Sequence, residues 1–511
     1  MNNLLDLIEN SSSEIIGLSQ YEENMLHEVT FDKINQWSTN VAYELKKKGL
    51  PKNSNIALFG KNSIEWIVSF FGIIKAGFTC VPIDSKLNFN ATNNIIRLSD
   101  SLFSICDNNK KIGIESLSFQ DIRNISNDKR EINFQNIDPN DIAIILFTSG
   151  TTGNPKGVML SHNNIISNLY QIKSKISLSK RLRTFSILPL SHVYELTCNI
   201  LLNISLKNKI HFCSSLDLKT MTKELKAFKP NIFPVVPLLL EKIKYGLTRK
   251  INESKILKLL YKLNPNIIGF ITRRNLGLQK LDFFFCGGAP LDKKTEFFFN
   301  DIGLRIYQGY GLSEASPLIS VNCPNNYMIG SVGQIVNQSQ IQIRKKDKEG
   351  NGIIFFKGPN VFKGYYKNKV ETDSIMDDGF MNTGDIGKLD DNNFLYITGR
   401  KKFVIIGPSG ENIYPEEIEE QINQNIEIEE SIIFSKDNKK IITIIKLKDE
   451  FLNLEDSKIK DIIENINNNN EVYKRISQIY ITNGDFEKTS TQKIKRNFLK
   501  TIDFNDYIEI N

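Results

Sequence analysis

Hydroxyl side chains, glycines and one lysine are concentrated in a short stretch that begins at residue 148. A loop of this composition can bind a polyphosphate, because backbone amides and hydroxyls donate to anionic oxygens, glycine permits close approach and lysine supplies a compact charge. The candidate ligands are Thr148, Ser149, Gly150, Thr151, Thr152, Gly153 and Lys156. The lysine follows Pro155, whereas the phosphate loop of Walker-type NTPases places glycine there, so that class is excluded. A plain polar turn uses the same residue types and is the alternative.

The segments around this loop predict an α/β fold. Residues 142–147 are apolar and predict a strand that leads into the loop, and a helical pattern resumes near Asn163. Upstream, predicted helices and short strands alternate over residues 34–46, 56–58, 63–74 and 79–83. This alternation is typical of a largely parallel sheet that is covered by helices.

The pattern changes in the last third of the chain. From Ile329 onward, short alternating strands with glycine turns predict a small barrel-like subdomain. After Arg400 the order is strand, helix, strand, strand and polar helix, which is enough for a small α+β domain. We therefore predict a large N-terminal domain at residues 1–400 and a small mobile C-terminal domain at residues 401–511.

Two local patterns in the C-terminal part have simple structural interpretations. The acidic run that begins at Pro415 predicts a helix start and not a metal site, because proline is favoured at the first helical position and acids in the first turn. The asparagines at residues 467–470 predict a loop.

The composition of the 511 residues is that of an ordinary globular protein, with 40% apolar residues and a formal net charge of +7. The basic residues are spread along the chain, so we expect no nucleic-acid partner; an excess of lysine suits anionic ligands and loose contact with anionic lipid. The six cysteines show no CxxC spacing, which predicts neither a zinc site nor a disulfide framework. Residues 66–74 are too short for a transmembrane span and fit a buried helix. With the cysteines as reduced thiols, a cytoplasmic location is the expectation.

Eight sequence blocks follow one another in the order of a known superfamily. They are KAGFTCVPID at 75–84, ILFTSGTTGNPKGVMLSHNN at 145–164, LPLSHVYE at 188–195, CGGAPLD at 286–292, YQGYGLSEASP at 307–317, NTGDIGKL at 382–389, ITGRKKFVIIGPSGENIYPEEIE at 397–419 and KTSTQKIKR at 488–496. They resemble the signatures of the adenylate-forming superfamily, which includes acyl-CoA synthetases, nonribosomal peptide adenylation domains and firefly luciferase. The resemblance implies an enzyme that uses ATP and Mg²⁺ to convert a carboxylic acid to an acyl-adenylate, and then transfers the acyl group to CoA.

The resemblance assigns the phosphate site to the loop. It implies that Lys156 and the loop hydroxyls hold the β- and γ-phosphates, and that Glu314 is the Mg²⁺ ligand. Ser313 and one loop hydroxyl, Ser149 or Thr148, are implied to assist it. A hard cation that bridges phosphate oxygens needs such a carboxylate.

For the nucleoside, the resemblance implies that Tyr310 stacks on adenine and that a small-residue turn lies against the other side of the ring. The residues assigned to the nucleoside here are Gly288, Ala289, Pro290, Gln308, Gly309, Tyr310 and Gly311. Asp385 matches the carboxylate that accepts both ribose hydroxyls, and Arg400 matches the arginine that also reaches the sugar.

Three further positions are implied to serve the alternation of domains. Lys493, rather than Lys495, matches the catalytic lysine that bridges carboxylate and α-phosphate oxygens during adenylation. Lys402 matches the hinge about which the small domain rotates. Gly410 belongs to the loop that is implied to lie beside the pantetheine arm of CoA. The motif departs from the family pattern at Gln492 and Glu487, where glycine and proline are common.

Two positions are candidates for the acyl site. His192 resembles the residue that gates the acyl pocket and contacts pyrophosphate, and its alternative is a histidine satisfied by packing. The phenylalanines at 283–285 line a fatty-acyl tunnel or form an ordinary buried strand.

The blocks at 188–195 and 397–419 look most like bacterial long-chain fatty-acid enzymes, so a fatty-acid CoA ligase is the first hypothesis. An enzyme that loads an acyl carrier protein is the second. A catalytically silent nucleotide-binding or acyl-binding protein is the third, and the presence of Lys156, Glu314, Asp385, Arg400 and Lys493 argues against it.

Overall fold

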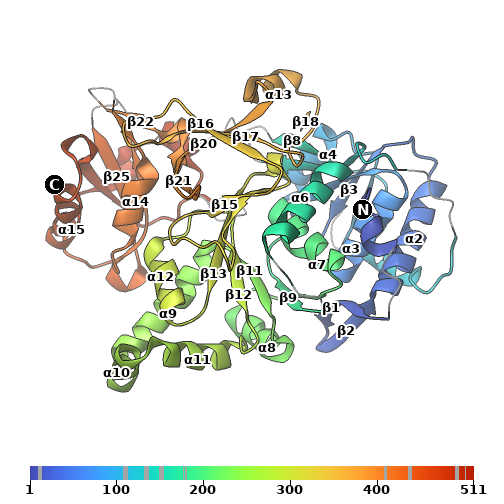
Figure 1. Ribbon diagram of the computed structural model, residues 1–511, viewed down its shortest axis with the longest axis horizontal. Coiled ribbons are helices and arrows are strands. Elements are labelled where there is room, and N and C mark those ends of the chain that lie inside the picture. The colour runs from blue at the N-terminus through green and yellow to red at the C-terminus, as the bar shows by residue number, and fades with distance from the viewer. Residues whose placement is uncertain are drawn as a thin grey trace. The chain divides into compact units, whose positions relative to one another are not determined.

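The computed structural model describes residues 1–9, 14–107, 113–131, 137–148, 155–176, 178, 181–407, 411–435, 440–488, 494–500 and 502–510. The chain forms two compact units (Figure 1). Unit 1 consists of Met1–Leu291, Thr295–Gln340 and Lys357–Gly379, and unit 2 consists of Asp292–Lys294, Ile341–Phe356 and Phe380–Asn511.

Unit 1 contains a sheet in which β3 is the parallel neighbour of both β4 and β5. In spatial order its strands are β18 (Gly364–Tyr365), β8 (Lys156–Ser161), β7 (Ile142–Thr148), β4 (Thr79–Ile83), β3 (Asn55–Phe59), β5 (Phe103–Cys106) and β6 (Ser116–Ser118). β7 continues the sheet in parallel to β4, and β8 returns antiparallel to β7. The phosphate loop is therefore the connection of a hairpin at one side of this sheet.

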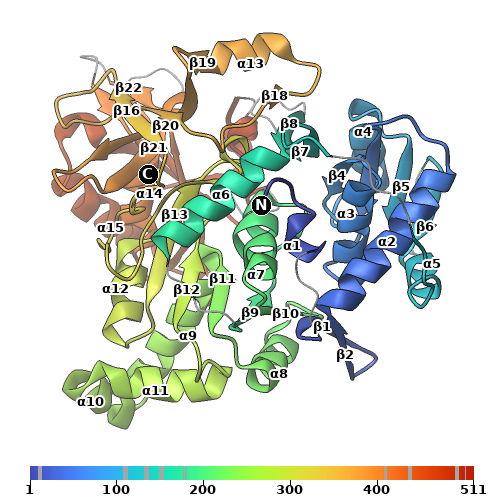
Figure 2. The same cartoon turned by 45° about the vertical axis from the view of Figure 1, so that its right-hand side comes forward.

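The helices beside this sheet explain its burial. Every residue of α3 (Ile64–Lys75) is buried, and its first turn is capped by the hydroxyl of Ser63, which accepts from the Trp66 amide. α2 (Phe31–Lys47) packs along α3 (Figure 2). The predicted helices at 34–46 and 63–74 and the predicted strands at 56–58 and 79–83 are thus confirmed, as is the interpretation of residues 66–74 as a buried helix.

A second sheet of unit 1 is parallel in its centre. Its strands, in spatial order, are β15 (Gln334–Ile335), β14 (Leu318–Val321), β13 (Ile306–Gly311), β12 (Phe283–Cys286), β11 (Ile232–Val235), β9 (Arg183–Ser186), β10 (Lys209–Phe212), β1 (Ile16–Glu22) and β2 (Met25–Thr30). Phe185, Phe233 and Phe284 belong to the hydrophobic core beside it. The parallel strands β11, β12 and β13 end side by side, so the turns after them lie at one edge of the sheet.

The other helices of unit 1 are mostly short. They are α1 (Asp6–Glu9), α4 (Phe89–Leu98), α5 (Phe119–Asn124), α6 (His162–Lys175), a π-helix (Tyr194–Leu201), α7 (Leu202–Ser205), α8 (Leu218–Phe228), α9 (Pro237–Glu253), α10 (Lys255–Leu263), α11 (Pro265–Leu276), α12 (Lys293–Asp301) and α13 (Lys369–Ile375), which precedes β19 (Met376–Asp377). None of the helices in the described part of the chain is long and apolar enough to cross a membrane.

Unit 2 holds the remaining strands in three groups. The first is β16 (Gln340–Arg344), β17 (Gly352–Lys357), β20 (Phe380–Leu389) and β21 (Leu395–Arg400), the second is the short ribbon β22 (Ile405–Ile406) and β23 (Asn412–Ile413), and the third is β24 (Ile428–Phe434), β25 (Ile441–Leu447), β26 (Ile476–Thr482) and β27 (Ile508–Glu509). α14 (Pro415–Asn423) and α15 (Asp456–Asn468) contribute buried isoleucines to the core of the third group.

These elements agree with the expected α/β fold with a curled strand region and an α+β end. α14 begins at Pro415, so the acidic run is a helix start as predicted. The loop predicted at 467–470 is partly wrong, because α15 extends through Asn468, where the buried Ile459, Ile463 and Ile466 hold one face of the helix against the core.

Candidate active site

The phosphate hairpin is paired up to the edge of its connecting loop. Thr148 at the end of β7 lies opposite Lys156, and Lys156 is the first residue of β8, so this lysine belongs to a strand and not to the loop. Ser149, Gly150, Thr151, Thr152 and Gly153 lie outside the described residues. After β8, α6 begins at His162 with a capping box of Ser161 and Asn164.

Lys156 and Glu314 meet in one cluster through a tyrosine. The Lys156 ammonium pairs with the Glu371 carboxylate, and it lies 5.4 Å from the centre of the Tyr365 ring. The Tyr365 hydroxyl donates to Glu314 Oε1 at 2.8 Å. We call Lys156, Glu314, Tyr365 and Glu371 the phosphate cluster.

The local fold explains how the cluster forms. β18 pairs with β8, so that Tyr365 lies opposite Val158, next to the lysine strand. Glu314 lies in the 3₁₀ turn Ser313–Ala315, whose backbone is fixed by the Phe362 amide, which donates to the Glu314 carbonyl at 2.9 Å. The Asn360 side chain, which is fully buried, donates to the Ala315 carbonyl at 2.6 Å. The turn thus holds the Glu314 backbone in place.

Sequence reasoning missed Tyr365 and Glu371. Tyr365 lies 51 residues from Glu314, and Glu371 lies 215 residues from Lys156, so no short motif joins them. Burial and the Glu314 charge raise the pKa of Tyr365, which keeps its hydroxyl protonated as a donor.

The two segments assigned to adenine lie at the carboxyl ends of neighbouring parallel strands, one in the turn after β12 and the other in the last residues of β13. Cys286 of β12 is paired with Gln308 of β13, and the turn of Gly288, Ala289 and Pro290 follows β12 directly. Gly288 has φ +88°, which favours glycine. A Cβ at Gly311 would lie 2.0 Å from the Pro317 carbonyl oxygen, so only glycine fits there. Tyr310, between Gly309 and Gly311, is 9% exposed.

Gln308 has a structural partner. Its amide donates to Glu296 Oε2 at 2.7 Å, and Glu296 also accepts from the Tyr327 hydroxyl and the Gly330 amide. The Gln308 carbonyl accepts from the Asn322 amide at 2.8 Å. These bonds tie β13 to α12 and occupy the side chain of Gln308.

His192 faces the last residue of the block at 75–84. Its Nε2 lies 3.7 Å from Asp84 Oδ2, and neither atom has a hydrogen-bond partner among the described residues. Burial lowers the pKa of His192, with Lys86 acting in the same direction and Asp84 against it, so the imidazole is neutral near pH 7. Two buried polar atoms, His192 Nε2 and Asp84 Oδ2, thus lie next to each other without a hydrogen bond between them.

An apolar pocket lies between α6, the π-helix and the strands β11 and β12. Its lining is Ile172, Ile176, Leu178, Cys198, Leu202, Asn203, Ile232, Pro234, Phe283 and Phe285, around about 290 Å³ of empty space, part of it open to solvent. The amide of Asn203 is hydrogen-bonded to Asn199, so its donor is occupied. Phe283 and Phe285 line the pocket whereas Phe284 lies in the core, and all three belong to the buried strand β12. The buried-strand interpretation is confirmed, and the acyl tunnel stays a prediction.

The π-helix carries a buried acid next to this pocket. Glu195 Oε1 accepts from the Ser186 hydroxyl at 2.6 Å and from the Asn199 amide at 2.8 Å. Burial raises the pKa of Glu195 to about 8, so the carboxyl is protonated at neutral pH. The preceding residue, Tyr194, donates its hydroxyl to the Phe285 carbonyl at 2.7 Å and ties the π-helix to β12. π-Helical segments are rare and are often found at functional sites.

In unit 2, the structure brings the two residues assigned to ribose together. Asp385 of β20 and Arg400 of β21 lie opposite each other, and Arg400 Nε is 2.8 Å from Asp385 Oδ1. The Asp385 side chain is 3% exposed, and its backbone amide donates to the Thr383 hydroxyl. Two neighbouring strands therefore present a fixed carboxylate with its cation.

Lys402 lies in the 3₁₀ turn Lys401–Phe403 that follows β21. Its ammonium lies 4.4 Å from the centre of the Phe403 ring, and the Arg496 guanidinium lies 4.7 Å from the same centre. Burial, together with Arg400 and Arg496, lowers the pKa of Lys402 to about 8.

Gly410 and Lys493 lie outside the described residues. The neighbouring Lys495 is occupied, because its ammonium is 2.5 Å from Glu487 Oε1 and its amide donates to the Glu487 carbonyl. Glu487, which stands where the family commonly has proline, thus pairs with Lys495, the alternative candidate for the catalytic lysine.

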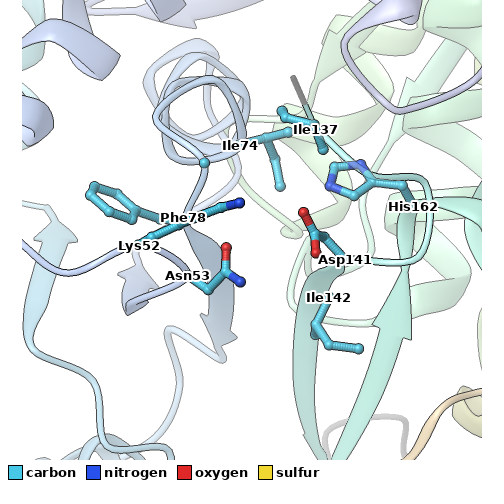
Figure 3. A pocket seen from close by; sticks show the side chains of 9 residues that line it. Lys52, Asn53, Ile74, Phe78, Ile137, Asp141, Ile142 and His162 are labelled. Atoms are coloured by element: carbon cyan, nitrogen blue, oxygen red, sulfur yellow. The ribbon is translucent and has the colours of Figure 1, made fainter. Parts of the chain in front are cut away.

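A second pocket of unit 1 is more polar and contains no predicted site residue (Figure 3). His162 and Asp141 face Lys52 and Asn53 across it. His162 Nδ1 accepts from the Leu4 amide, and burial lowers the pKa of His162 to about 4, so this imidazole anchors the N-terminal segment. We assign it a structural role.

The sequence profile of the AMP-binding enzyme family matches residues 20–366, and the profile of the C-terminal domain of AMP-binding enzymes matches residues 403–509. This chain belongs to the AMP-binding enzyme family. It is therefore an adenylate-forming enzyme of the acid–thiol ligase type, as the eight sequence blocks indicate.

Relatives in this AMP-binding family include a rat long-chain-fatty-acid–CoA ligase, ACSBG2, which is 29% identical over 480 residues, covering 82% of this chain and 72% of the relative. The fold is that of o-succinylbenzoate coenzyme A synthetase (MenE) from Bacillus subtilis, solved in complex with ATP and magnesium ion, at a TM-score of 0.82 and 20% identity over 98% of this chain and 99% of that one. ATP-bound MatB from Rhodopseudomonas palustris is similar, with a TM-score of 0.83 and 21% identity over 98% and 99% of the two chains.

Proposed function

We propose that this enzyme activates a medium- to long-chain fatty acid with ATP, and then transfers the acyl group to CoA with release of AMP. The observation that carries the choice of acid is the lining of the pocket beside β12, which is aliphatic and aromatic apart from Asn203 and Cys198. An apolar chain gains about 0.8 kcal/mol for each buried CH₂, and such a pocket offers nothing to a second charge. The similarity to the fatty-acid ligase ACSBG2 supports the same choice.

The phosphate cluster has the side chains that the first half-reaction needs. The acid's carboxylate oxygen attacks the α-phosphorus of ATP, the bond to the oxygen that bridges to the β-phosphate breaks, and pyrophosphate leaves. In this scheme the Lys156 ammonium leaves the Glu371 carboxylate and binds the phosphates that will depart as pyrophosphate. Two anions must approach each other, so fixed positive charge at this place lowers the barrier.

Glu314 fits the ligand set of Mg²⁺. Mg²⁺ in nucleotide sites is held by one or two carboxylates together with phosphate oxygens and water, and Glu314 offers a carboxylate whose backbone is fixed. When bound, the ion neutralises phosphate charge. Among the described residues there is no group of three or more metal-ligating side chains, as expected for a site that the nucleotide completes.

The nucleoside is assigned to two sets of residues, one for adenine and one for the ribose. Gly288, Ala289 and Pro290 and the strand end Gly309 to Gly311 are proposed to enclose adenine, with Tyr310 stacked on the ring. Asp385 accepts from the two ribose hydroxyls, and Arg400 fixes this carboxylate.

The second half-reaction is proposed to use a rotation of residues 401–511 against residues 1–400 about Lys402. In this scheme Lys493 serves the adenylation step, and the loop with Gly410 serves the transfer to the CoA thiol. The thiol sulfur attacks the acyl carbonyl carbon, and AMP leaves with the bonding electron pair. We place the reaction in the cytoplasm.

The test is ATP–pyrophosphate exchange with a panel of acids from acetate to oleate, with benzoate added, and then product analysis with CoA and with an acyl carrier protein. We expect exchange that peaks at medium to long chains, and acyl-CoA as the product. A peak with benzoate or acetate would overturn the substrate. Product formed only with the carrier protein would overturn the acceptor. No exchange with any acid would favour a silent binding protein.

Lys493→Ala separates the two half-reactions. The variant is expected to lose acyl-adenylate formation by a factor of about 10² to 10³, since one fixed charge in the transition state contributes about this much. It should still convert supplied acyl-adenylate and CoA to acyl-CoA. Lys495→Ala is the matched control, and loss of adenylation in that variant alone would show that the catalytic lysine is Lys495.

A further inference from the structure

Helices α9, α10 and α11 carry the net charge of the whole chain. Residues 237–276 contain nine lysines and arginines and two glutamates, a formal net charge of +7, which equals that of all 511 residues. The rest of the sequence is therefore balanced. α10 and α11 lie side by side at the lower edge of Figures 1 and 2.

α10 has two apolar faces. Leu257, Leu260 and Tyr261 pack against the core of unit 1. Ile256, Leu259 and Leu263, spaced i, i+3 and i+7, form a second stripe that is exposed to 72%, 58% and 72%. Of the nine residues of α10, all of which the structure describes, none is fully buried. An apolar stripe of this length is unusual on a helix that faces only water.

A row of lysines runs beside the exposed stripe. Lys255, Lys258 and Lys262 recur at the same i, i+3 and i+7 spacing and are exposed. At 3.6 residues per turn this row is displaced by about 100° from the apolar stripe. Lysines in this position can extend their ammonium groups to an anionic surface while the apolar side chains enter it.

The same features continue into α11 and the end of α9. Phe270 of α11 is 66% exposed, and Lys250 and Arg274 are exposed as well. Other basic residues of these helices serve the fold, because Arg273 donates to backbone carbonyls of unit 1 and Arg249 pairs with a glutamate of its own helix. The basic residues of this region are thus partly structural and partly presented at the surface.

We propose that the α10 face, defined as Ile256, Leu259 and Leu263 with Lys255, Lys258 and Lys262, docks on the surface of an anionic lipid bilayer. The net charge of residues 237–276 favours a bilayer over a second copy of this chain as the binding partner. A second copy of the chain would place another +7 segment against this one, which is repulsive, whereas an anionic bilayer attracts basic side chains and accepts apolar ones below its headgroups. The proposal is independent of the chemistry of the active site.

The experiment is sedimentation of the full-length protein with vesicles of phosphatidylcholine alone and of equimolar phosphatidylcholine and phosphatidylglycerol. We expect binding to the anionic vesicles and little to the neutral ones. Raising salt from about 0.1 M to about 1 M, which shortens the screening length from about 10 Å to about 3 Å, should release most of the protein.

Two triple variants test the two rows. Lys255→Gln with Lys258→Gln and Lys262→Gln should weaken binding on the order of 100-fold, because each basic residue near an anionic surface contributes about fivefold. Ile256→Ser with Leu259→Ser and Leu263→Ser should weaken it to a similar degree. Lys345→Gln with Lys346→Gln and Lys348→Gln removes the same charge from unit 2 and should have little effect.

The outcomes separate the occupants. Equal loss in the α10 lysine variant and the control would overturn the proposal, because it would show attraction by net charge alone. Failure of the wild type to bind anionic vesicles would overturn it too, as would concentration-dependent dimerisation that the serine variant abolishes. Unchanged ATP–pyrophosphate exchange and unchanged thermal unfolding in both variants show that the fold is intact.

Discussion

Unit 1 treats charge in opposite ways at its two candidate subsites. In the phosphate cluster, Lys156, Glu371 and Glu314 are charged residues held by pairing and by the Tyr365 hydroxyl. Beside the apolar pocket, Glu195 is hydrogen-bonded to neutral side chains and is protonated, because burial raises its pKa to about 8. The phosphate cluster thus contains paired charges, whereas the acid beside the apolar pocket is neutral.

This difference matches the two reactants that we propose, ATP and a fatty acid. A polyphosphate that binds Lys156 takes the place of the Glu371 carboxylate, so one anion is exchanged for another at the same ammonium group. A hydrocarbon chain makes no polar contacts, and an ionised carboxylate at its wall would carry a large desolvation cost. Four substitutions can break or refine this contrast between the subsites.

Lys156→Ala should have the strongest consequence. Removal of the cation of the phosphate cluster is expected to lower kcat/KM for adenylation by about 10² to 10³, as for other donors that act on developing charge. Pyrophosphate exchange measures it. Lys363→Ala, which removes an exposed lysine of the same unit, is the control. A fall of less than about threefold would show that this cluster is not the phosphate site.

Cys198→Phe should change the choice of acid. The phenyl ring takes up space in the pocket, and the ratio of kcat/KM for long acids to that for short acids is expected to fall about 10- to 100-fold, since one methylene is worth up to about 3 kcal/mol in a tight pocket. Cys198→Ala should leave the ratio nearly unchanged. Because the readout is a ratio, a general loss of stability cancels. An unchanged ratio in Cys198→Phe would place the acyl chain elsewhere.

Glu195→Gln tests whether the Glu195 carboxyl is protonated, by the pH dependence of the free energy of unfolding. The raised pKa means that the wild type gains stability from the proton at low pH and loses it as pH rises from the ordinary glutamate value toward about 8. The amide cannot lose a proton. Relative to the wild type, the variant should therefore gain about 2 kcal/mol between pH 6 and pH 8. Thermal unfolding at both pH values measures this as a few degrees in Tm. A pH-independent difference would mean that Glu195 is ionised.

Glu371→Gln should change activity least, with the opposite sign to Lys156→Ala. Loss of the competing carboxylate frees Lys156, so the KM for ATP is expected to fall by up to about fivefold, the range for partly exposed ion pairs. Asp373→Asn makes the same change of charge at an exposed position of α13. A rise in KM for Glu371→Gln alone would indicate that Glu371 contacts the nucleotide or its ion directly.

Local pattern predicted the elements that carry the candidate site. The apolar run before the loop is β7, and β4 has the expected bounds. The turn at 288–290 follows β12, and residues 309–311 end the neighbouring parallel strand β13, because βα units bring strand ends to one edge. The resemblance assigns Asp385 and Arg400 to one group of the nucleotide, and the register of β20 and β21 places them together.

Pairings between distant segments could not be predicted. Tyr365 and Glu371 reach the Lys156 cluster only through β18 and α13, and nothing in their immediate sequence indicates a partner near residue 156. The proton on Glu195 also depends on tertiary burial, although the residue ends one of the motifs. Alternation within the phenylalanine triplet would have separated Phe284 from its two neighbours.

Because the pocket is lined by the π-helix Tyr194–Leu201, its shape depends on the number of residues in this helix as well as on their identity. Deletion of one residue within it would convert the segment to ordinary α-helical winding, which changes the side-chain positions within the segment. Cys198 and Leu202 would then no longer share a wall with Phe285, and Glu195 would leave Ser186. With the acyl chain in this pocket, as we propose, natural variants that differ here by a single-residue insertion or deletion are expected to differ in the acids they accept, while their adenylation chemistry stays the same.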